Sequence, residues 1–402
     1  MTTSLSRGLV ALFACASGLS VANVYYAQPL LDALAHDFLI PRAAIGGVVL
    51  ATQIGSALAL VLLVPLGDLW NRRRLMLVQA LLLAAVLIGI GCATSPVALL
   101  AGMLGAGLLG TAMTQGLIAY AASAAGPDER GRVVGAAQSG VFVGLLLARV
   151  LSGGISDLAG WRAVYASSAT AMMVLAVLLW RALPALPIAS GNLGYPRLLA
   201  SMVELLRTER VLRVRGVLAM LMFAALNIFW SALVLPLSGP PYGYSHTAIG
   251  AFGLVGALGA LAAARAGRWA DRGLGERTTA IALALLIAAW VPLALMGVSL
   301  WALLLGIVLL DLGAQAIHVT NQSMIFTRRP DAHSRMVGVY MLFYAVGSGL
   351  GAMATTSVYA VRGWPGVCVL GASVSLLALI VWMTTLERGT SRVRTTCTLH
   401  GG

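Results

Sequence analysis

Four polar side chains recur at helical spacing within one long apolar stretch of the chain. Asp311, Gln315, His318 and Gln322 follow at i, i+4, i+7 and i+11, so they fall on one face of a helix. An aspartate and a histidine can exchange protons, and the amides can hydrogen-bond a solute. A charged group at the centre of a lipid bilayer costs about 2.5–3.5 kcal/mol, so we expect such residues to be functional.

A second apolar stretch carries an arginine on a face with the same spacing. Gln138, Phe142, Leu145 and Arg149 repeat the pattern, and Arg149 and Asp311 are the two charges that lie clearly inside apolar stretches. We expect both faces to border a central cavity. There, burial would favour the protonated form of Asp311, and a nearby arginine would favour the ionised form. A balance that changes as the cavity opens to either side suits proton coupling. Two alternatives stay open: an Asp311 that is permanently paired, and a His318 that only hydrogen-bonds.

Further candidates for the cavity wall combine aromatic surface with hydrogen-bonding groups. Each could also serve helix packing or an interfacial aromatic belt. Asp32, near the end of the first apolar stretch, is expected to be solvated, with a role as a second proton carrier as the alternative. The candidates are Asn23, Tyr26 and Gln28 in the first stretch, Phe223, Asn227 and Trp230 in the seventh, and Tyr340 and Tyr344 in the eleventh.

The elements that must position these residues are transmembrane helices. Of the 402 residues, 60% are hydrophobic and 10% are charged, which excludes an ordinary soluble protein. With about 20 apolar residues per span, we expect an all-α membrane protein of twelve helices. They lie near 8–31, 43–66, 75–94, 97–123, 133–156, 161–183, 212–236, 247–266, 278–298, 300–326, 336–360 and 364–386.

The basic residues give the orientation of this bundle. The formal net charge is +13, yet the chain has no lysine, and its arginines lie in loops rather than on one nucleic-acid-binding face. Arg42, Arg162 and Arg362 fall on one side of the membrane and the other loop arginines on the opposite side. By the positive-inside rule we expect a multi-pass protein of the cell inner membrane, with both termini cytoplasmic and no nucleic-acid partner.

Two kinds of site are not expected. The four cysteines form neither a disulfide framework nor a metal site, and no P-loop is present, so we expect no cofactor beyond a proton gradient as the coupling ion. The sequence from Gly105 to Gly110 satisfies GxGxxG, but it lies within an apolar span. Its small residues are better explained by close helix approach.

An internal repeat divides the chain. At an offset of 203 residues (271 − 68), Asp68 matches Asp271, Pro127-Asp128 matches Pro330-Asp331, and the turn Gly160-Trp161 matches Gly363-Trp364. Because the offset covers six spans, the halves should be related by an axis along the membrane normal. We expect halves at 1–183 and 212–386, a cytoplasmic linker with an amphipathic helix at 184–211, and a tail at 387–402.

The loop motif resembles that of the major facilitator superfamily, G-x-L-a-D-r-x-G-r-r. The first copy, Val64 to Arg73, keeps Leu66, Asp68 and the arginines, and the second, Gly267 to Gly275, keeps the first glycine, Asp271 and Arg272. The glycine-rich fifth span and the opening Asn23-Val-Tyr25-Tyr26-Ala-Gln28-Pro29 are similar to the twelve-helix drug:proton antiporter branch, including purine-nucleoside and sugar efflux pumps. The resemblance implies a cytoplasmic gate that closes in the outward-facing state. Its residues are Asp68, Arg72, Arg73, Asp128, Asp271, Arg272, Asp331 and Arg335.

The resemblance implies a transporter rather than an enzyme. We expect a monomeric secondary transporter that exports a small organic compound, such as a drug, nucleoside or sugar, in exchange for protons by alternating access across the lipid bilayer. The alternative is a proton-coupled uptake permease for a small nutrient. A non-transporting membrane sensor is a remote alternative, for which the sequence offers no soluble domain.

Overall fold

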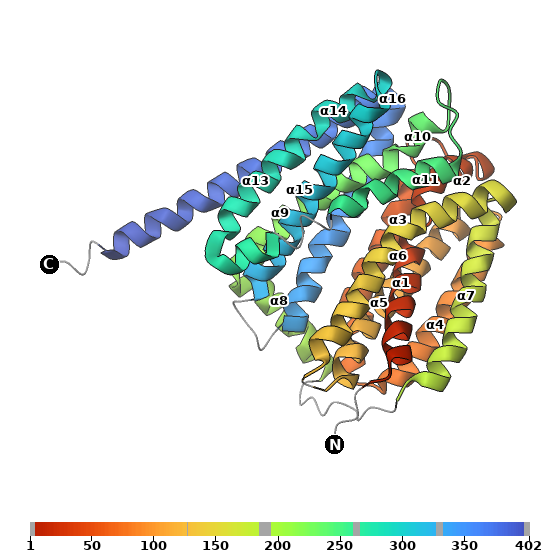
Figure 1. Ribbon diagram of the computed structural model, residues 1–402, viewed down its shortest axis with the longest axis horizontal. Helices are drawn as coiled ribbons and strands as arrows, with labels where there is room; N and C mark the ends of the chain where they lie inside the picture. The colour runs from red at the N-terminus through yellow and green to blue at the C-terminus, as the bar shows by residue number, and fades with distance from the viewer. Residues whose placement is uncertain (1–4, 127, 185–193, 260–265, 327–332, 398–402) are drawn as a thin grey trace.

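The computed structural model of the chain describes residues 5–126, 128–184, 194–259, 266–326 and 333–397, nearly all of them helical (Figure 1). Ten described helices are long and apolar enough to cross a membrane. One of them, Arg335–Leu386, has 52 residues and turns back at Gly363, so it provides two spans. With the shorter apolar helix His246–Leu258 in the eighth position, the predicted twelve-helix fold is confirmed.

The helices form two lobes that lie side by side (Figure 1). The N-lobe comprises α1 (Arg7–Tyr25), η1 (Gln28–Leu30), α2 (Leu31–Asp37), α3 (Gly46–Leu58), η2 (Ala59–Leu63), η3 (Val64–Asp68), α4 (Arg72–Gly91), α5 (Pro96–Ala124), α6 (Arg130–Ala159) and α7 (Trp161–Ala182). After α8 (Tyr195–Thr208), the C-lobe comprises α9 (Arg210–Ala232), α10 (Val234–Leu237), α11 (His246–Val255), η4 (Gly256–Leu258), η5 (Ala270–Leu274), α13 (Gly275–Ala288), α14 (Trp290–Ala294), η6 (Leu295–Gly297), α15 (Leu300–Phe326) and α16 (His333–Cys397).

The two ends of the bundle differ in charge. We call the end at which α4, α6 and α9 begin the arginine-rich end, and the end formed by α2, α10 and the start of α11 the arginine-poor end. At the arginine-rich end, Arg72 to Arg74 were expected in a loop, but they form the first turn of α4. The cause is the N-cap at Asn71, whose side chain accepts the backbone N–H of Arg74 at 3.1 Å.

Glycines bring the first and fifth spans into backbone contact within the N-lobe. A Cβ added at Gly140 would lie 2.0 Å from the carbonyl oxygen of Ala14, and one added at Gly144 would lie 2.3 Å from that of Gly18. No side chain fits in this space, so α1 and α6 can cross this closely only through glycine.

The internal repeat reappears as matched geometry in the C-lobe. Gly347, which the repeat pairs with Gly144, would place a Cβ 2.0 Å from the carbonyl oxygen of Met220 in α9. Gly160 and Gly363 both adopt positive φ, +81° and +60°, in the turns that precede Trp161 and Trp364. Such φ values favour glycine, so the same turn is built twice.

The lobes meet along two helix pairs at the arginine-poor end. In one, α3 contacts α16, and the backbone N–H of Gly46 donates to the hydroxyl of Thr356 at 3.2 Å. In the other, α6 contacts α11, and a Cβ at Gly153 would lie 2.2 Å from the carbonyl oxygen of His246. These contacts close that end of the bundle.

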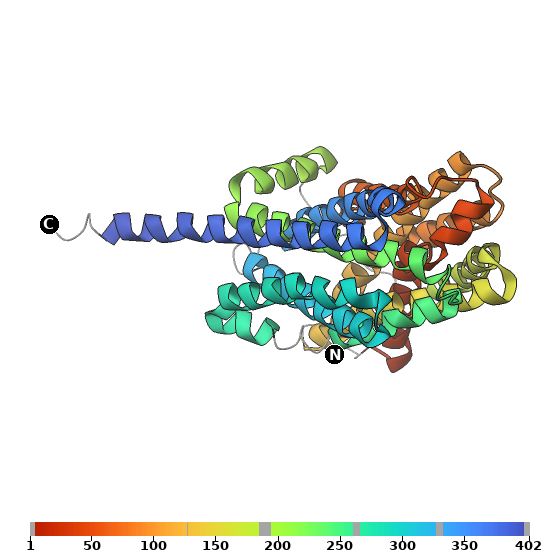
Figure 2. The ribbon, with the colours of Figure 1, turned by 90° about the horizontal axis from the view of Figure 1, so that it is seen from above.

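A short helix, α8, lies in the connection between the lobes. In α8, Met202 and Leu205 are buried against Met336 and Val339, whereas Glu204 is exposed. Helix α16 continues to Cys397 and projects beyond the rest of the molecule (Figure 2). The expected tail at 387–402 therefore begins as a continuation of the last helix, and residues 185–193 and 398–402 lie outside the described residues.

A substitution of Gly140 by alanine should loosen the N-lobe. The added methyl group would overlap the carbonyl of Ala14, so we expect a loss of about 1–3 kcal/mol in stability and a lower melting temperature of the purified protein. Gly135→Ala is the matched control on the same helix, because nothing lies within 4 Å of its added Cβ. Equal melting temperatures for the two variants would contradict this account of the α1–α6 contact.

Candidate functional site

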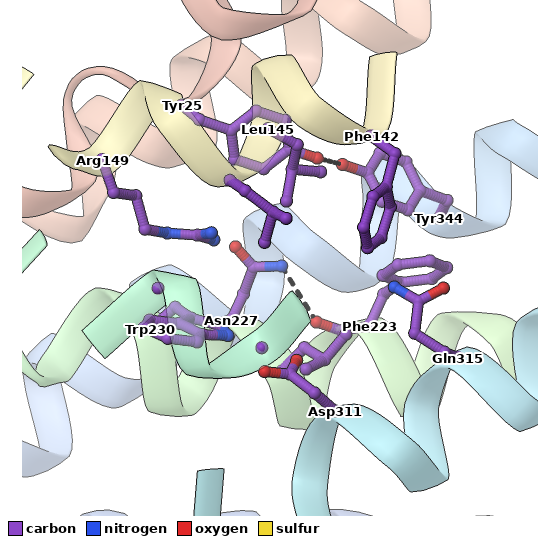
Figure 3. A pocket seen from close by; sticks show the side chains of 14 residues that line it. Tyr25, Phe142, Leu145, Arg149, Phe223, Asn227, Trp230, Asp311, Gln315 and Tyr344 are labelled. Atoms are coloured by element: carbon purple, nitrogen blue, oxygen red, sulfur yellow. Dashed lines mark hydrogen bonds between the residues drawn. The ribbon is translucent and has the colours of Figure 1, made fainter. Parts of the chain in front are cut away.

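A central cavity lies between the lobes and has two parts that share lining residues. Figure 3 shows the side chains that line the smaller part. The smaller part has a volume of about 70 Å³ and the larger about 350 Å³. The larger part extends past Gln138 and Gln322 toward the arginine-rich end. Residues that line both parts are Tyr25, Phe142, Leu145, Phe223, Gln315 and Tyr344.

Arg149 lies at the closed end of this cavity and is 6% exposed. Its Nε–H donates to Oε1 of Gln28 at 3.0 Å, and the amide of Gln28 donates to Oδ1 of Asn227 at 3.1 Å. The guanidinium carbon lies 4.4 Å from the ring centroid of Trp230 and 5.5 Å from that of Tyr25. Hydrogen bonding and cation–π contact thus stabilise a charge away from water, with partners from both lobes.

Asp311 lies across the smaller part of the cavity and is 8% exposed. Its Oδ2 is buried without a hydrogen-bond partner. A buried polar atom without a partner is costly, so this oxygen is a site for a proton or for a donor on a bound molecule. The Asp311 carboxyl also interacts with the charge of Arg149 and with the side chain of Trp230, so a paired Asp311 and a protonatable Asp311 both stay open.

Glycines on the α11–η4 segment make room for both charged side chains. A Cβ at Gly253 would lie 3.2 Å from Cδ of Arg149, and one at Gly256 would lie 2.5 Å from Oδ2 of Asp311. Gly253 and Gly256 both line the smaller part of the cavity. Larger residues here would separate or displace the two charges.

The polar face of α15 runs along the cavity. Asp311 and Gln315 line the smaller part, and Gln315, His318 and Gln322 line the larger part. Nδ1 of His318 lies 3.0 Å from the hydroxyl of Tyr340, and the rings of Phe223 and His318 meet edge to face at 5.3 Å between centroids. Asp311 is therefore the deepest polar group on a continuous polar strip.

Aromatic rings form the middle of the cavity wall. The hydroxyls of Tyr25 and Tyr344 hydrogen-bond to each other across the lobes, as the dashed line in Figure 3 shows. Phe223 packs edge to face on Tyr344 with 4.2 Å between centroids. Flat apolar surface thus lies beside amides and charged groups, an arrangement suited to a small organic molecule.

Four predicted wall residues, Asn23, Tyr26, Gln28 and Tyr340, line neither part of the cavity in the described structure. Gln28 accepts a hydrogen bond from Arg149 instead. Asn23 and Tyr26 face the interior of the N-lobe, where Oδ1 of Asn23 accepts the hydroxyl of Ser168 at 2.7 Å. Tyr340 is 1% exposed and lies behind His318. In the first span, the residue that faces the cavity is Tyr25. Gln28, three residues later, lines a small neighbouring cavity together with Arg149 and Trp230.

The predicted gate residues at the arginine-rich end are only partly described. Asp331 and the side chains of Asp68 and Asp271 lie outside the described residues, and Asp128 and Arg272 are exposed. Nε of Arg72 donates to the carbonyl of Gly67 at 2.7 Å, and Arg73 donates to the carbonyl of Trp180. Those two arginines bind their own lobe in this state.

Glu129 ties the start of the chain to α6 beside this gate. It accepts the backbone N–H of Leu5 at 2.9 Å and pairs with Arg132 at 2.8 Å. The N–H of Leu5, followed by the guanidinium of Arg132, lowers the pKa of the Glu129 carboxyl.

Several residues at the inter-lobe seam are not among the predicted site residues. Gly253 and Gly256 carried no polar signal. His246 and Asp157 lie at helix ends, where charged residues are ordinarily solvated. Asp32 was expected to be solvated, but its side chain is only 25% exposed and contacts His246 across the lobes.

A Gly256→Ala substitution should report the tight fit around Asp311. The three nearest atoms to the added Cβ all belong to the Asp311 side chain, so we expect a loss of about 1–3 kcal/mol in unfolding measurements of the purified protein. In an Asp311→Ala background the same substitution should cost much less, because the obstructing carboxyl is gone. An equal cost in both backgrounds would show that Gly256 contacts something else.

The chain resembles known proteins over nearly its whole length. Residues 12–272 and 216–397 match the family model described as Major Facilitator Superfamily. The chain is 40% identical over 380 residues to the Escherichia coli O157:H7 protein named Uncharacterized transporter YgaY, covering 94% of this chain and 95% of that protein.

Two solved structures share the fold. A bacterial homolog of the human lysosomal transporter Spinster, in an inward-facing and occupied conformation, matches with a TM-score of 0.78 and 14% identity, covering 94% of this chain and 96% of its own. The nucleoside transporter NupG matches with a TM-score of 0.72 and 14% identity, covering 94% and 99%. The solved structures show the fold alone, whereas the family model and the sequence relative also show the family. The chain belongs to the Major Facilitator Superfamily and is a transporter of that type.

Proposed function

We propose that this transporter exports a small organic compound in exchange for protons. The observation that carries the proposal is the buried carboxylate of Asp311, whose Oδ2 has no partner although it lines the inter-lobe cavity. A group placed there can bind a proton in one state of the cycle and release it in another. Since the coupling ion is a proton, no further cofactor is required.

The setting of Asp311 supports this role. Arg149 lines the same part of the cavity and donates to Gln28 of its own lobe, and Gln28 in turn donates to Asn227 of the other lobe. When the lobes rock apart at the arginine-poor end, the Gln28–Asn227 hydrogen bond and the contact of Arg149 with Trp230 must break, and the charge and water around Asp311 change. That change couples protonation of Asp311 to the conformational cycle.

The cavity favours a neutral or weakly charged substrate with a flat apolar part. Its walls combine the rings of Tyr25, Phe142 and Phe223 with the amides of Gln138 and Gln315. The volume of about 350 Å³ is near the lower end of the range for drug-sized ligands. Drugs, nucleosides and sugar-like compounds with such surfaces are the classes to test.

Orientation follows from the arginines. We place the arginine-rich end and both termini in the cytoplasm, with the transporter acting as a monomer in the lipid bilayer of the inner membrane. The larger part of the cavity extends toward this end while contacts close the other, which supports an inward-facing state.

In the opposite, outward-facing state, the gate around Asp68, Arg72 and Asp271 would hold the arginine-rich end closed. Surface ion pairs of this kind contribute about 0–1 kcal/mol each, so they are weak enough to break in every cycle.

A toxicity and growth screen tests the direction of transport. Cells that overproduce the protein and cells that lack it are compared over a panel of antimicrobials, nucleosides, sugars and their toxic analogues. Export predicts that overproduction raises, and deletion lowers, the tolerated concentration of at least one compound. A growth requirement, or sensitivity of overproducing cells to a toxic analogue, would instead show uptake.

Replacement of Asp311 by asparagine tests the coupling. In proteoliposomes loaded with a compound identified by the screen, we expect Asp311→Asn to reduce the rate of transport driven by a pH gradient at least about tenfold. This corresponds to an increase of roughly 1.4 kcal/mol or more in the activation free energy of transport. Exchange of substrate for substrate, which needs no net proton movement, should persist. Glu204→Gln, an exposed change on α8, is the control. Undiminished gradient-driven transport in Asp311→Asn would remove this residue from the coupling.

A further inference from the structure

Three titratable side chains from both lobes meet at the arginine-poor end. Nε2 of His246, the first residue of α11, lies 2.9 Å from Oδ1 of Asp32 in α2. Nδ1 of the same ring lies 3.0 Å from Oδ1 of Asp157 in α6. The three side chains are only 22–25% exposed, so they form a partly enclosed cluster at the seam.

The geometry requires an extra proton on His246. A neutral imidazole has one N–H and one bare nitrogen, so it can donate to only one acceptor. Here both ring nitrogens face carboxylate oxygens at hydrogen-bond distance. With both aspartates ionised, only the imidazolium ion satisfies both contacts, and its positive charge between two carboxylates makes both bonds charge-assisted.

Asp157 is held in place by more than the ring. Its Oδ1 accepts the backbone N–H of His246 at 3.0 Å, and its Oδ2 accepts the backbone N–H of Thr247 at 2.7 Å. An N-lobe carboxylate thus caps the first turn of a C-lobe helix, where the helix dipole favours negative charge. The ring of His246 is therefore fixed against Asp157 as long as the lobes stay together.

Other charged groups on the packed elements have their own partners or lie deeper. On α2, Asp37 pairs with Arg162 at 2.7 Å, and the 90% exposed His36 lies 3.6 Å from Asp37. On α6, Arg149 lies two turns deeper and bonds to Gln28. On α15, Asp311 lies beside Gly256 and His318 beyond it, and η1 and α10 contribute no titratable side chain.

We infer that His246, Asp32 and Asp157 form a second proton-binding site, distinct from Asp311, that holds a proton while the arginine-poor end is closed. Parting of the lobes takes His246 away from both aspartates and exposes its ring to water, where the extra proton is lost near neutral pH. Closure of this end and proton binding are therefore linked. The inference depends on the proposed function only for the statement that this end faces the outside.

The sign of the linkage follows from this arrangement. The closed state binds one proton more than the open state, so acid favours closure of the arginine-poor end and alkali favours its opening. In the proposed orientation, an acidic exterior would keep an empty transporter closed to the outside. The proton at the seam would then favour closure of the arginine-poor end, while the proton on Asp311 is bound and released within the cavity.

A distance measurement across the seam tests the inference. Val97 in the N-lobe and Val298 in the C-lobe are 76% and 85% exposed near this end. Both are replaced by cysteine for spin labelling, in the full chain with Cys15, Cys92, Cys368 and Cys397 replaced by alanine. Pulsed electron paramagnetic resonance is recorded in lipid nanodiscs at several pH values from 5 to 9, with protons as the only ligand. We expect the short-distance population to fall, and a longer distance to grow, as the pH rises.

Two variants assign this transition to the cluster. His246→Gln keeps hydrogen-bonding capacity but cannot bind the proton, and should remove the pH dependence. Asp32→Asn removes one of the two charges that face the ring and should move the midpoint to lower pH by about one unit or more. His36→Gln, an exposed histidine on α2, is the matched control and should leave the midpoint unchanged.

The outcomes separate this site from the coupling proposed for Asp311. Distances that do not depend on pH in the parent, or a transition that persists in His246→Gln, would overturn the inference. The series is repeated in an Asp311→Asn background, where the transition should persist if the seam is an independent site. Its disappearance in that background would assign the proton to Asp311 instead. Failure of Asp311 as the coupling residue is detected separately, by the transport assay.

Discussion

The close approach of helix backbones at glycine is the constraint on which the rest of this structure depends. Each lobe places its first and fifth spans in backbone contact, through Gly140 and Gly144 in one half and Gly347 in the other. Between the lobes, Gly153 and Gly250 bring α6 against α11 in the same way. In lipid, the hydrophobic effect does not drive the association of apolar helices as it does for soluble proteins in water. Close van der Waals packing at these glycines therefore holds the helices together.

The two buried charges are stabilised unequally, and this inequality gives the cavity its chemical character. Arg149 has an amide acceptor and two aromatic faces, so its charge is satisfied without any ligand. Asp311 keeps an oxygen without a partner in the same cavity. In this state of the transporter, a cation with its own partners lies in the same cavity as a carboxylate oxygen that lacks one. The glycines of the α11–η4 segment allow the two side chains to reach one cavity.

The sequence predicted the architecture well because apolar length and arginine placement are local properties. The span predicted at 300–326 coincides with α15, and the polar face of that helix follows the cavity as its spacing indicated. The GxGxxG match also proved to be a packing motif, since a Cβ at Gly107 would lie 1.9 Å from the carbonyl oxygen of Thr52.

The errors arose where a face or a partner depends on the other lobe. The sequence predicts Tyr26 rather than Tyr25 in the cavity wall, because two adjacent aromatic residues on a helix give no indication of which faces the centre. It predicts a solvated Asp32, because the partner of Asp32, His246, is more than two hundred residues away in the chain and contacts it only across the lobes. Spacing within a helix cannot supply information of that kind. Asp68 and Asp271, although clear in the sequence, have side chains outside the described residues, so their role in the gate stays a prediction.

The cap that Asp157 places on α11 has a further consequence for how this protein can be studied. The backbone amides of His246 and Thr247 are bonded to a carboxylate from the other lobe, so they lose these acceptors whenever the lobes part. Their exchange with deuterium would then accelerate, because amides in the first turn of a helix have no acceptor within the helix. The deuterium exchange of these two amides is thus a marker of the conformational cycle in the unmodified chain. It can be followed by mass spectrometry in native membranes without labels, inhibitors or a known substrate.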